Sequence, residues 1–135
     1  MSNSKIKSIK TKSGAGAKLA RSPCPITNAL DLLGDKWTLV VIRDLFLGKH
    51  TYGEFQTSPE GIPTNILAER LKRLLDSGII SKEAYQERPV RYAYSLTKKG
   101  TALAPVVEEI ANWGLKNIEG TTAKLGMVKN GKLKF

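Results

Sequence analysis

Residues 61–78 have the sequence GIPTNILAERLKRLLDSG. Pro63 or Thr64 is expected to begin a helix here, because proline is favoured in the first turn, and Gly78 is expected to end it. Leucines recur at i, i+4, i+7 and i+8, the spacing of one helix face, at Leu67, Leu71, Leu74 and Leu75. The opposite face carries Asn65, Glu69, Lys72 and Arg73. The stretch therefore predicts an amphipathic helix with a polar, partly cationic outer face.

A shorter helix and a turn are predicted directly before it. Residues 51–55, with the sequence TYGEF, are long enough for about one helical turn. Residues 58–61, with the sequence SPEG, are typical of a turn. A short helix, a turn and an amphipathic helix within about 25 residues form a helix-turn-helix.

The periodicity after this unit is that of strands. Residues 80–85 are one candidate strand, and residues 91–96 alternate large side chains with smaller or polar ones. Residues 86–89 are expected to form the hairpin tip, because Pro89 cannot donate a hydrogen bond inside a β-ladder. A two-stranded hairpin that follows a helix-turn-helix is a wing.

Helices are predicted on both sides of this winged unit. Pro25 is placed to begin a helix that Gly34 ends, and Asp35 can cap a nearly all-apolar helix over residues 37–47. Thr97 can cap a closing helix whose apolar spacing continues to residue 118. Pro105 is expected to kink this helix or to split it in two.

The positive charge is concentrated at the two ends of the chain. The sequence has 22 Lys and Arg against 12 Asp and Glu, a net charge of +10. Residues 1–21 carry six cations and no acid, and residues 119–135 carry four lysines and one acid, so residues 22–118 are almost neutral. We predict a flexible basic arm (1–21), a folded domain (22–118) and a basic C-terminal tail (119–135). A solubilising arm and an arm that contacts phosphates fit residues 1–21 equally well.

Several classes of function are excluded or disfavoured by the composition. The chain of 135 residues has one cysteine, Cys24, and one histidine, His50, which excludes an internal disulfide framework and a multi-cysteine metal site. No apolar run approaches the length of a membrane span. We therefore expect a cytoplasmic protein that is not an enzyme, requires no cofactor or metal and does not contact a membrane.

Several separate motifs resemble those of the HxlR-type winged helix-turn-helix regulators. They are CPI (24–26), LGDKWT (33–38), YGEF (52–55), GIPTNILAERL (61–71), PVRYAYSLT (89–97), LAPV (103–106) and WG (113–114). The resemblance covers roughly residues 22–118, with the motifs in the same order and spacing. It implies a homodimeric bacterial or archaeal transcription regulator whose first and last helices build the dimer.

The start of the helix at 63–73 is the expected site of base contacts. Asn65 can bind adenine through two hydrogen bonds, and Thr64 offers a hydroxyl and a methyl group. Glu69 can accept from cytosine, although a salt bridge with Arg73 at i, i+4 is favoured. Lys72 and Arg73 suit phosphate or guanine, and a solvated helix face explains them equally well. At the wing, Arg88 and Arg91 are expected to reach phosphates or the minor groove.

A long apolar stripe on the closing helix exceeds what so small a sheet can cover. We predict a two-fold interface that places two recognition helices roughly 34 Å apart, one turn of DNA. Its residues are Ile26, Leu30, Leu33, Val106, Ile110 and Trp113. For Trp113, packing inside one chain is the alternative. The expected fold class is thus mainly α with a small β wing (α+β), a winged helix-turn-helix with N- and C-terminal dimerisation helices.

Cys24 has two interpretations. Some members of the resembled family use a cysteine here to sense oxidants or electrophiles, and a helix start can lower the pKa of a thiol. An inert, half-buried thiol near the interface is the favoured alternative. A small molecule or an oxidant thus stays open as an effector.

We therefore predict a homodimeric, sequence-specific regulator that binds a pseudo-palindromic operator in double-stranded DNA. A winged helix that binds only proteins would keep the fold without DNA affinity that depends on salt. A basic RNA-associated protein would bind through its lysine-rich ends.

Overall fold

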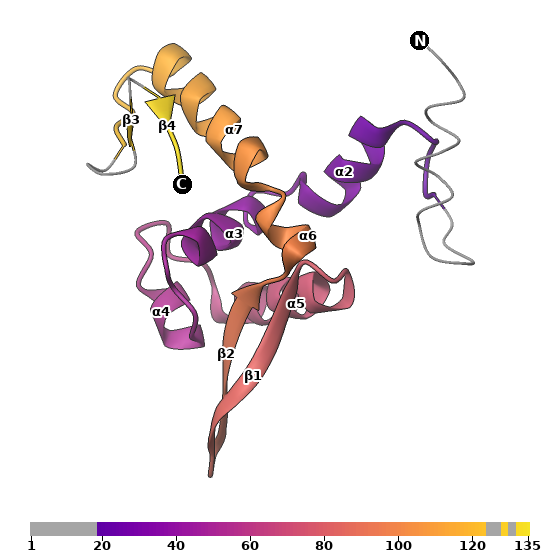
Figure 1. Ribbon diagram of the computed structural model, residues 1–135, viewed down its shortest axis with the longest axis vertical. Coiled ribbons are helices and arrows are strands. Elements are labelled where there is room, and N and C mark those ends of the chain that lie inside the picture. The colour runs from indigo at the N-terminus through magenta and orange to yellow at the C-terminus, as the bar shows by residue number, and fades with distance from the viewer. Residues whose placement is uncertain (1–18, 124–127, 130–131) are drawn as a thin grey trace.

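The computed structural model describes residues 19–123, 128–129 and 132–135 and shows a helical domain with a β wing (Figure 1). The helices are α2 (Pro25–Leu33), α3 (Thr38–Phe46), α4 (Tyr52–Gln56), α5 (Thr64–Asp76), α6 (Lys98–Thr101) and α7 (Ala104–Asn117). Strands β1 (Ile80–Glu87) and β2 (Val90–Leu96) form the wing, and β3 (Val128–Lys129) and β4 (Lys132–Leu133) form a smaller hairpin. The mainly α winged helix-turn-helix is therefore confirmed.

The helix ends lie where the sequence predicted them. Helix α2 begins at Pro25, and Gly34 follows its last residue. A Cβ atom on Gly34 would lie 2.4 Å from the carbonyl oxygen of Leu30, so a side chain here would force the turn to shift. Asp35 accepts hydrogen bonds from the backbone N–H groups of Trp37 and Thr38, at 3.0 and 3.2 Å, and so begins α3.

Pro105 splits the closing helix into two. Helix α6 ends at Thr101, and α7 begins at Ala104 with Pro105 in its first turn. In that position the missing N–H of proline costs no intrahelical hydrogen bond. Thr97 caps α6 as predicted, because its hydroxyl accepts from the backbone N–H of Gly100 at 3.2 Å.

The wing strands are longer than the sequence pattern predicted. The antiparallel pairing runs from Ile80 opposite Leu96 to Glu87 opposite Val90, so that only Arg88 and Pro89 remain at the tip. Pro89 sits in the turn itself, where no ladder hydrogen bond is required of it, and the strands can pair up to its neighbours.

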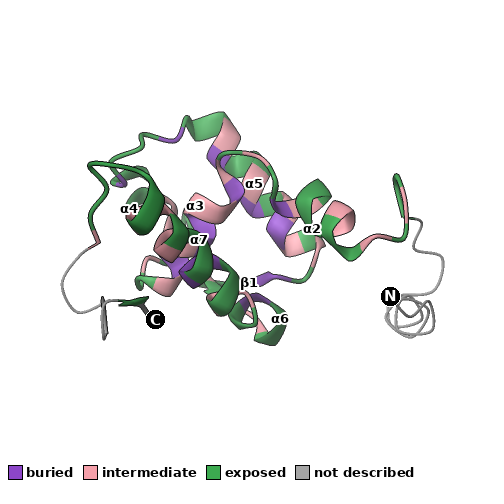
Figure 2. Ribbon diagram, turned by 90° about the horizontal axis from the view of Figure 1, so that it is seen from above, coloured by how far each residue is buried: buried purple, intermediate pink, exposed green. Residues whose placement is uncertain are grey.

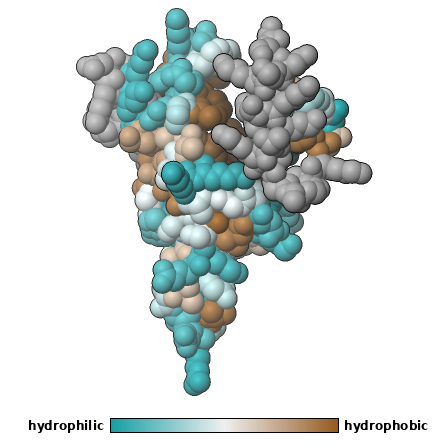
Figure 3. Space-filling model, turned by 45° about the vertical axis from the view of Figure 1, so that its right-hand side comes forward, coloured by the Kyte–Doolittle hydropathy of each residue, from teal (hydrophilic) through white to brown (hydrophobic). Residues whose placement is uncertain are grey.

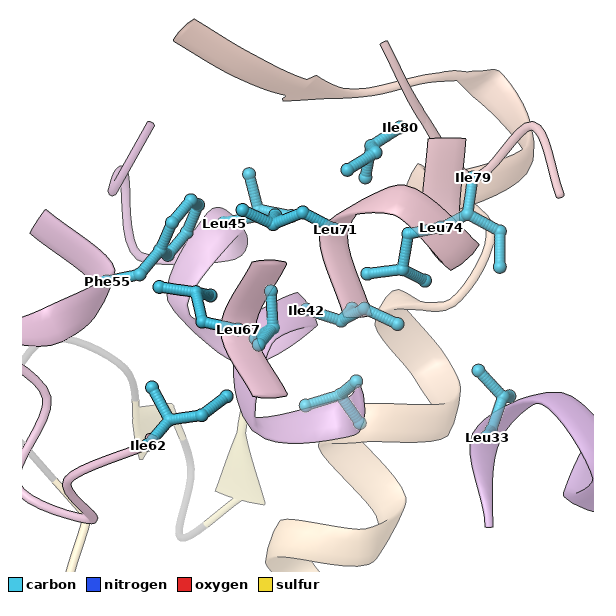
Figure 4. Close-up of a cluster of buried hydrophobic side chains, with 12 residues drawn as sticks. Leu33, Ile42, Leu45, Phe55, Ile62, Leu67, Leu71, Leu74, Ile79 and Ile80 are labelled. Atoms are coloured by element: carbon cyan, nitrogen blue, oxygen red, sulfur yellow. The ribbon is translucent and has the colours of Figure 1, made fainter. Parts of the chain in front are cut away.

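The core lies where α3, α5 and the start of the wing meet (Figure 4). Phe55, Ile42, Leu67 and Leu74 are among the largest fully buried side chains. Burial of each such side chain contributes about 1.5–3 kcal/mol relative to exposure. Figure 2 shows the buried residues gathered along α3 and α5, whereas most of α2 is at least partly exposed. Helix α3, which the sequence predicted as nearly all-apolar, is thus the central helix of the domain.

The two basic ends are described only in part. Residues 1–18, most of the predicted flexible arm, lie outside the described residues, as do 124–127 and 130–131. In the predicted C-terminal tail, β3 pairs with β4, and the ring of Phe135 stacks on that of Phe46 in α3. This hairpin and the ring contact were not predicted from the sequence.

Among the described residues, none of the helices combines the length and the apolar character that spanning a bilayer requires.

Candidate nucleic-acid interface

The N-terminal end of α5 presents exposed polar side chains. Thr64 and Asn65 are both exposed in its first turn, and Asn65 makes no side-chain hydrogen bond with the described residues. The phenol of Tyr52, in α4, donates to the backbone carbonyl of Thr64 and so ties the two helices together. The predicted base-contacting residues therefore stand on a helix start whose position is fixed by the helix before it.

The ion pairs on the outer face of α5 differ from those predicted. Glu69 pairs with its neighbour Arg70 rather than with Arg73. Lys72, exposed, lies 3.6 Å from Asp76 at i, i+4. Of the predicted DNA-binding residues in α5, Thr64, Asn65, Glu69 and Lys72 thus share the exposed face.

Arg73 does not lie on that face. One nitrogen of its guanidinium donates to Asp35 at 2.8 Å, to the hydroxyl of Thr38 at 2.8 Å and to the carbonyl of Leu32 at 3.2 Å. Arg73 has the helical spacing of an outer-face residue, and no local pattern in the sequence shows that Asp35 lies across from it. The structure corrects that assignment: this guanidinium joins α5 to the segment between α2 and α3.

Asp35 is the centre of this polar cluster. Partial burial raises its pKa, but hydrogen bonds from Thr38, from Arg70 and from the backbone of Trp37 outweigh that effect and hold the pKa well below its usual value. Asp35 is therefore ionised throughout the physiological pH range. The sequence indicated Asp35 only as a possible cap of the helix that follows, and not as an acceptor for arginines of α5.

The turn between α4 and α5 is tied to α3 by a second cluster. Asp44, 2% exposed, accepts from the hydroxyl of Ser58 in the turn. The guanidinium of Arg43 donates to both carboxylate oxygens of Glu60, at 2.7 and 2.8 Å. These hydrogen bonds lower the pKa of Glu60 to about 2. The helix-turn-helix angle thus rests on polar contacts as well as on the core.

The tip of the wing is exposed and cationic. Arg88 and Arg91 are both exposed, and neither forms a salt bridge with the described residues. Lower in the wing, the ammonium group of Lys82 lies 4.2 Å from the ring centroid of Tyr92, a cation–π contact within the wing. Figure 3 shows the wing as a narrow projection with a hydrophilic end.

Helices α2 and α7 lie on the side of the fold away from the wing tip (Figure 1), and both carry exposed apolar side chains. Ile26 is 69% exposed and Trp113 is 63% exposed, so the alternative that Trp113 packs inside one chain does not hold. Leu30, Val106 and Ile110 are exposed as well. Leu33, in contrast, is 8% exposed and belongs to the core of its own chain, so it offers little surface to a partner.

Cys24 precedes α2 and is partly buried. Hydrogen bonds from the backbone and side chain of Thr27 and from the backbone of Ile26 lower the pKa of its thiol. The helix start thus shifts Cys24 toward the thiolate, in agreement with the first of its two interpretations.

The short helix, the turn, the second helix with its exposed polar start and the two-stranded wing make the chain a winged helix-turn-helix protein. Comparison with known proteins gives the family. The HxlR-like helix-turn-helix family matches residues 32–122, and the chain belongs to it. YvaP of Bacillus subtilis (strain 168), an uncharacterized HTH-type transcriptional regulator, is 35% identical over 97 residues, 71% of this chain and 90% of YvaP. The predicted resemblance is confirmed.

Two solved structures share the fold. The reduced form of the transcriptional regulator YodB from B. subtilis is 35% identical, with a TM-score of 0.60 over 73% of this chain and 98% of that chain. The redox regulator HypR in its reduced form is 31% identical, with a TM-score of 0.66 over 71% of this chain and 95% of that chain.

Proposed function

We propose that the chain acts in the cytoplasm as a homodimer that binds a pseudo-palindromic operator in double-stranded DNA, with residues 22–118 as the operative domain. The observation that carries the proposal is the division of the surface. The polar start of α5 and the tip of the wing are exposed, and the exposed apolar residues of α2 and α7 lie on the other side of the fold. One side suits a duplex and the other suits a second copy of the chain.

On the DNA side, each element has one task. The start of α5 enters the major groove, where Thr64 and Asn65 read base edges and Lys72 stands near the phosphates. Arg88 and Arg91 extend the contact to the backbone or the adjacent minor groove. Arg73, held by Asp35, takes no part in base reading.

On the dimer side, the exposed apolar residues of α7 lie along one face of the helix. Val106, Ile110 and Trp113 stand at i, i+4 and i+7, and Ile26 and Leu30 stand at i and i+4 on α2. Burial of such faces against a two-fold copy removes apolar surface from water and fixes two recognition helices in one orientation. Two half-sites related by symmetry follow from that arrangement.

Selection of bound fragments from random-sequence duplex DNA tests this function. We expect a motif with two-fold symmetry and half-sites about one helical turn apart. Equal binding of every duplex, or no binding, would favour a protein-interaction module. A chain that loses most of its affinity when residues 1–21 are deleted, and that prefers RNA, would be an RNA-associated protein.

We propose an oxidant as the effector to test first. The support is the lowered pKa of Cys24 and its place at the start of α2, together with the likeness to HypR. Because the chain has one cysteine, oxidation can join Cys24 only to a second subunit or to a small thiol. Diamide, which takes up the electrons of two thiols, should alter operator binding by the wild type and leave Cys24→Ser unchanged. Equal responses of both proteins would make Cys24 an inert thiol.

A further inference from the structure

The recognition helix α5 carries two arginines that point toward the rest of the fold. The Nε atom of Arg70 donates to one carboxylate oxygen of Asp35 at 2.8 Å, and Arg73 donates to the other at 2.8 Å. The side chain of Arg70 is 17% exposed and that of Asp35 is 25% exposed. The two arginines are three residues apart, nearly one helical turn. A single carboxylate therefore holds α5 at two points along its length.

The same cluster reaches α2 and α3. Arg73 also donates to the carbonyl of Leu32, in the last turn of α2, and to the hydroxyl of Thr38, the first residue of α3. Thr38 is fully buried and donates to Asp35 in turn. The end of α2, the start of α3 and the middle of α5 thus meet at one set of charge-assisted hydrogen bonds, which are stronger and more directional than neutral ones.

We propose that Asp35 is a positioning residue that sets the direction of α5 relative to α2, and thereby the distance between the two recognition helices of the dimer. This inference rests on the proposed function, in which α2 meets the partner subunit and α5 enters the groove. In this proposal Asp35 itself contacts neither DNA nor the partner. It acts through Arg70 and Arg73, by fixing the helix that reads DNA to the helix that defines the two-fold axis.

The consequence is a preference for operator geometry rather than for base identity. Thr64 and Asn65 are exposed, are not among the hydrogen-bond partners of Asp35 in the described residues, and read the bases of one half-site locally. The number of base pairs between half-sites, in contrast, must match the separation of two helices whose angle the cluster fixes. A loosened cluster lets each α5 adopt a range of angles, so that operators with altered spacing are bound almost as well as the best one.

Asp35→Asn is the variant that separates these effects. An asparagine keeps one side-chain oxygen for the backbone N–H groups of Trp37 and Thr38, so the start of α3 is retained, but the negative charge and one acceptor are lost. The matched control is Asp31→Asn. Asp31 lies in α2 and pairs with the exposed Arg21 at 2.6 Å, and it makes no contact with α5 among the interactions of the described residues.

The experiment measures binding of one palindromic operator, obtained by selection, and of versions with one base pair inserted or removed between the half-sites. We expect wild type and Asp31→Asn to discriminate against the altered spacings, and Asp35→Asn to lose about tenfold of that discrimination. The preference for bases within a half-site should stay unchanged in all three proteins. A merely structural role of Asp35 would lower all affinities together and would not move the spacing preference.

An Asp35→Asn protein that is folded and dimeric and keeps the wild-type spacing preference overturns the inference. Should that variant not fold, Arg73→Lys takes its place. It keeps the charge but loses the planar fork that reaches several partners, and it must show the same selective loss of spacing preference. A wild type without any sequence preference would instead refute the proposed function itself, before the variants are compared.

Discussion

The ring of Phe135 lies flat against the ring of Phe46, with centroids 4.8 Å apart and planes 9° from parallel. The backbone N–H of Phe135 donates to the buried carboxylate of Glu108, in α7, at 2.7 Å. This residue lies beyond the segment 32–122 that the family match covers. The segment after β4 is thus anchored to both α3 and α7.

Phe135→Ala should lower the free energy of unfolding by about 1–2 kcal/mol, less than for a fully buried phenylalanine, because the ring is 40% exposed. Urea denaturation measures this change. The control is Lys134→Ala, which removes only a partly exposed ion pair with Glu108 at 3.8 Å and should have little effect. Wild-type stability in Phe135→Ala would mean that the ring contact contributes nothing in solution.

Asn65→Ala should relax the preference at one base pair of each half-site by about 1–3 kcal/mol, because a bidentate contact to a base edge is lost. Competition binding with operators altered one base pair at a time measures it. Gln56→Ala, which removes an exposed amide at the end of α4, is the matched control. An equal loss of affinity for random DNA would argue against base reading by Asn65.

Replacement of both Arg88 and Arg91 by alanine should weaken binding to all sequences alike. The slope of log affinity against log salt should become shallower by about two units, since two phosphate contacts are removed. Lys116, in α7, and Lys132, in β4, provide a control pair of equal charge away from the wing. If the wing variant keeps the wild-type slope, the tip of the wing does not touch the backbone.

Trp113→Ala should shift the dimer toward monomer in sedimentation velocity runs over a range of concentrations. The reason is that the exposed indole is the largest apolar group of the α7 face, and burial of such a group contributes several kcal/mol to association. Leu47→Ala changes an exposed apolar residue at the end of α3 and should leave the dimer intact. A full-size dimer of Trp113→Ala would place the interface elsewhere.

The pair of Arg43 and Glu60 predicts a dependence of stability on pH. The folded state lowers the pKa of Glu60 from 4.5 to about 2, so its contribution is present above pH 4.5 and is lost as the pH falls toward 2. Glu60→Gln should therefore melt below wild type at neutral pH, and the two melting curves should converge near pH 2. The difference in melting temperature between Glu60→Gln and wild type should be small, because the Glu60 side chain is 38% exposed and water screens its ion pair. Glu87→Gln, which removes an exposed carboxylate at the wing tip, is the control and should melt with wild type at neutral pH.

Local patterns in the sequence predicted most of the fold. Pro25 begins α2, Thr97 caps α6 and Pro105 splits the closing helix, each as expected. Asp35 accepts from backbone N–H groups at the start of α3, although Trp37 is the residue that directly precedes that helix. The leucine spacing of α5 likewise reports its buried face directly. The strands of the wing ran farther than predicted, because Pro89 occupies the turn and does not interrupt the ladder.

Contacts between segments distant in the sequence could not be predicted in this way. The helical spacing of Arg73 predicts that it lies on the outer face of α5. In the folded chain it bonds to Asp35, from the segment before α3, which no local pattern predicts. The helical spacing of Leu33 matches that of Ile26 and Leu30 and so predicts an interface residue, but its side chain is buried in the core of its own chain. Phe135 follows a lysine-rich stretch without apolar periodicity, so the sequence gives no sign of its partner. Only the folded chain shows that its ring stacks on the ring of Phe46.

Because Arg70 and Arg73 belong to the scaffold, they set a limit on attempts to retarget this protein. In a library that randomises the whole of α5, most members would lose Arg70 or Arg73, and α5 would then be wrongly oriented. Substitutions limited to positions 64, 65, 68, 69 and 72, all exposed, would change the side chains that face the groove. Arg70 and Arg73 would meanwhile keep the orientation of α5 through Asp35.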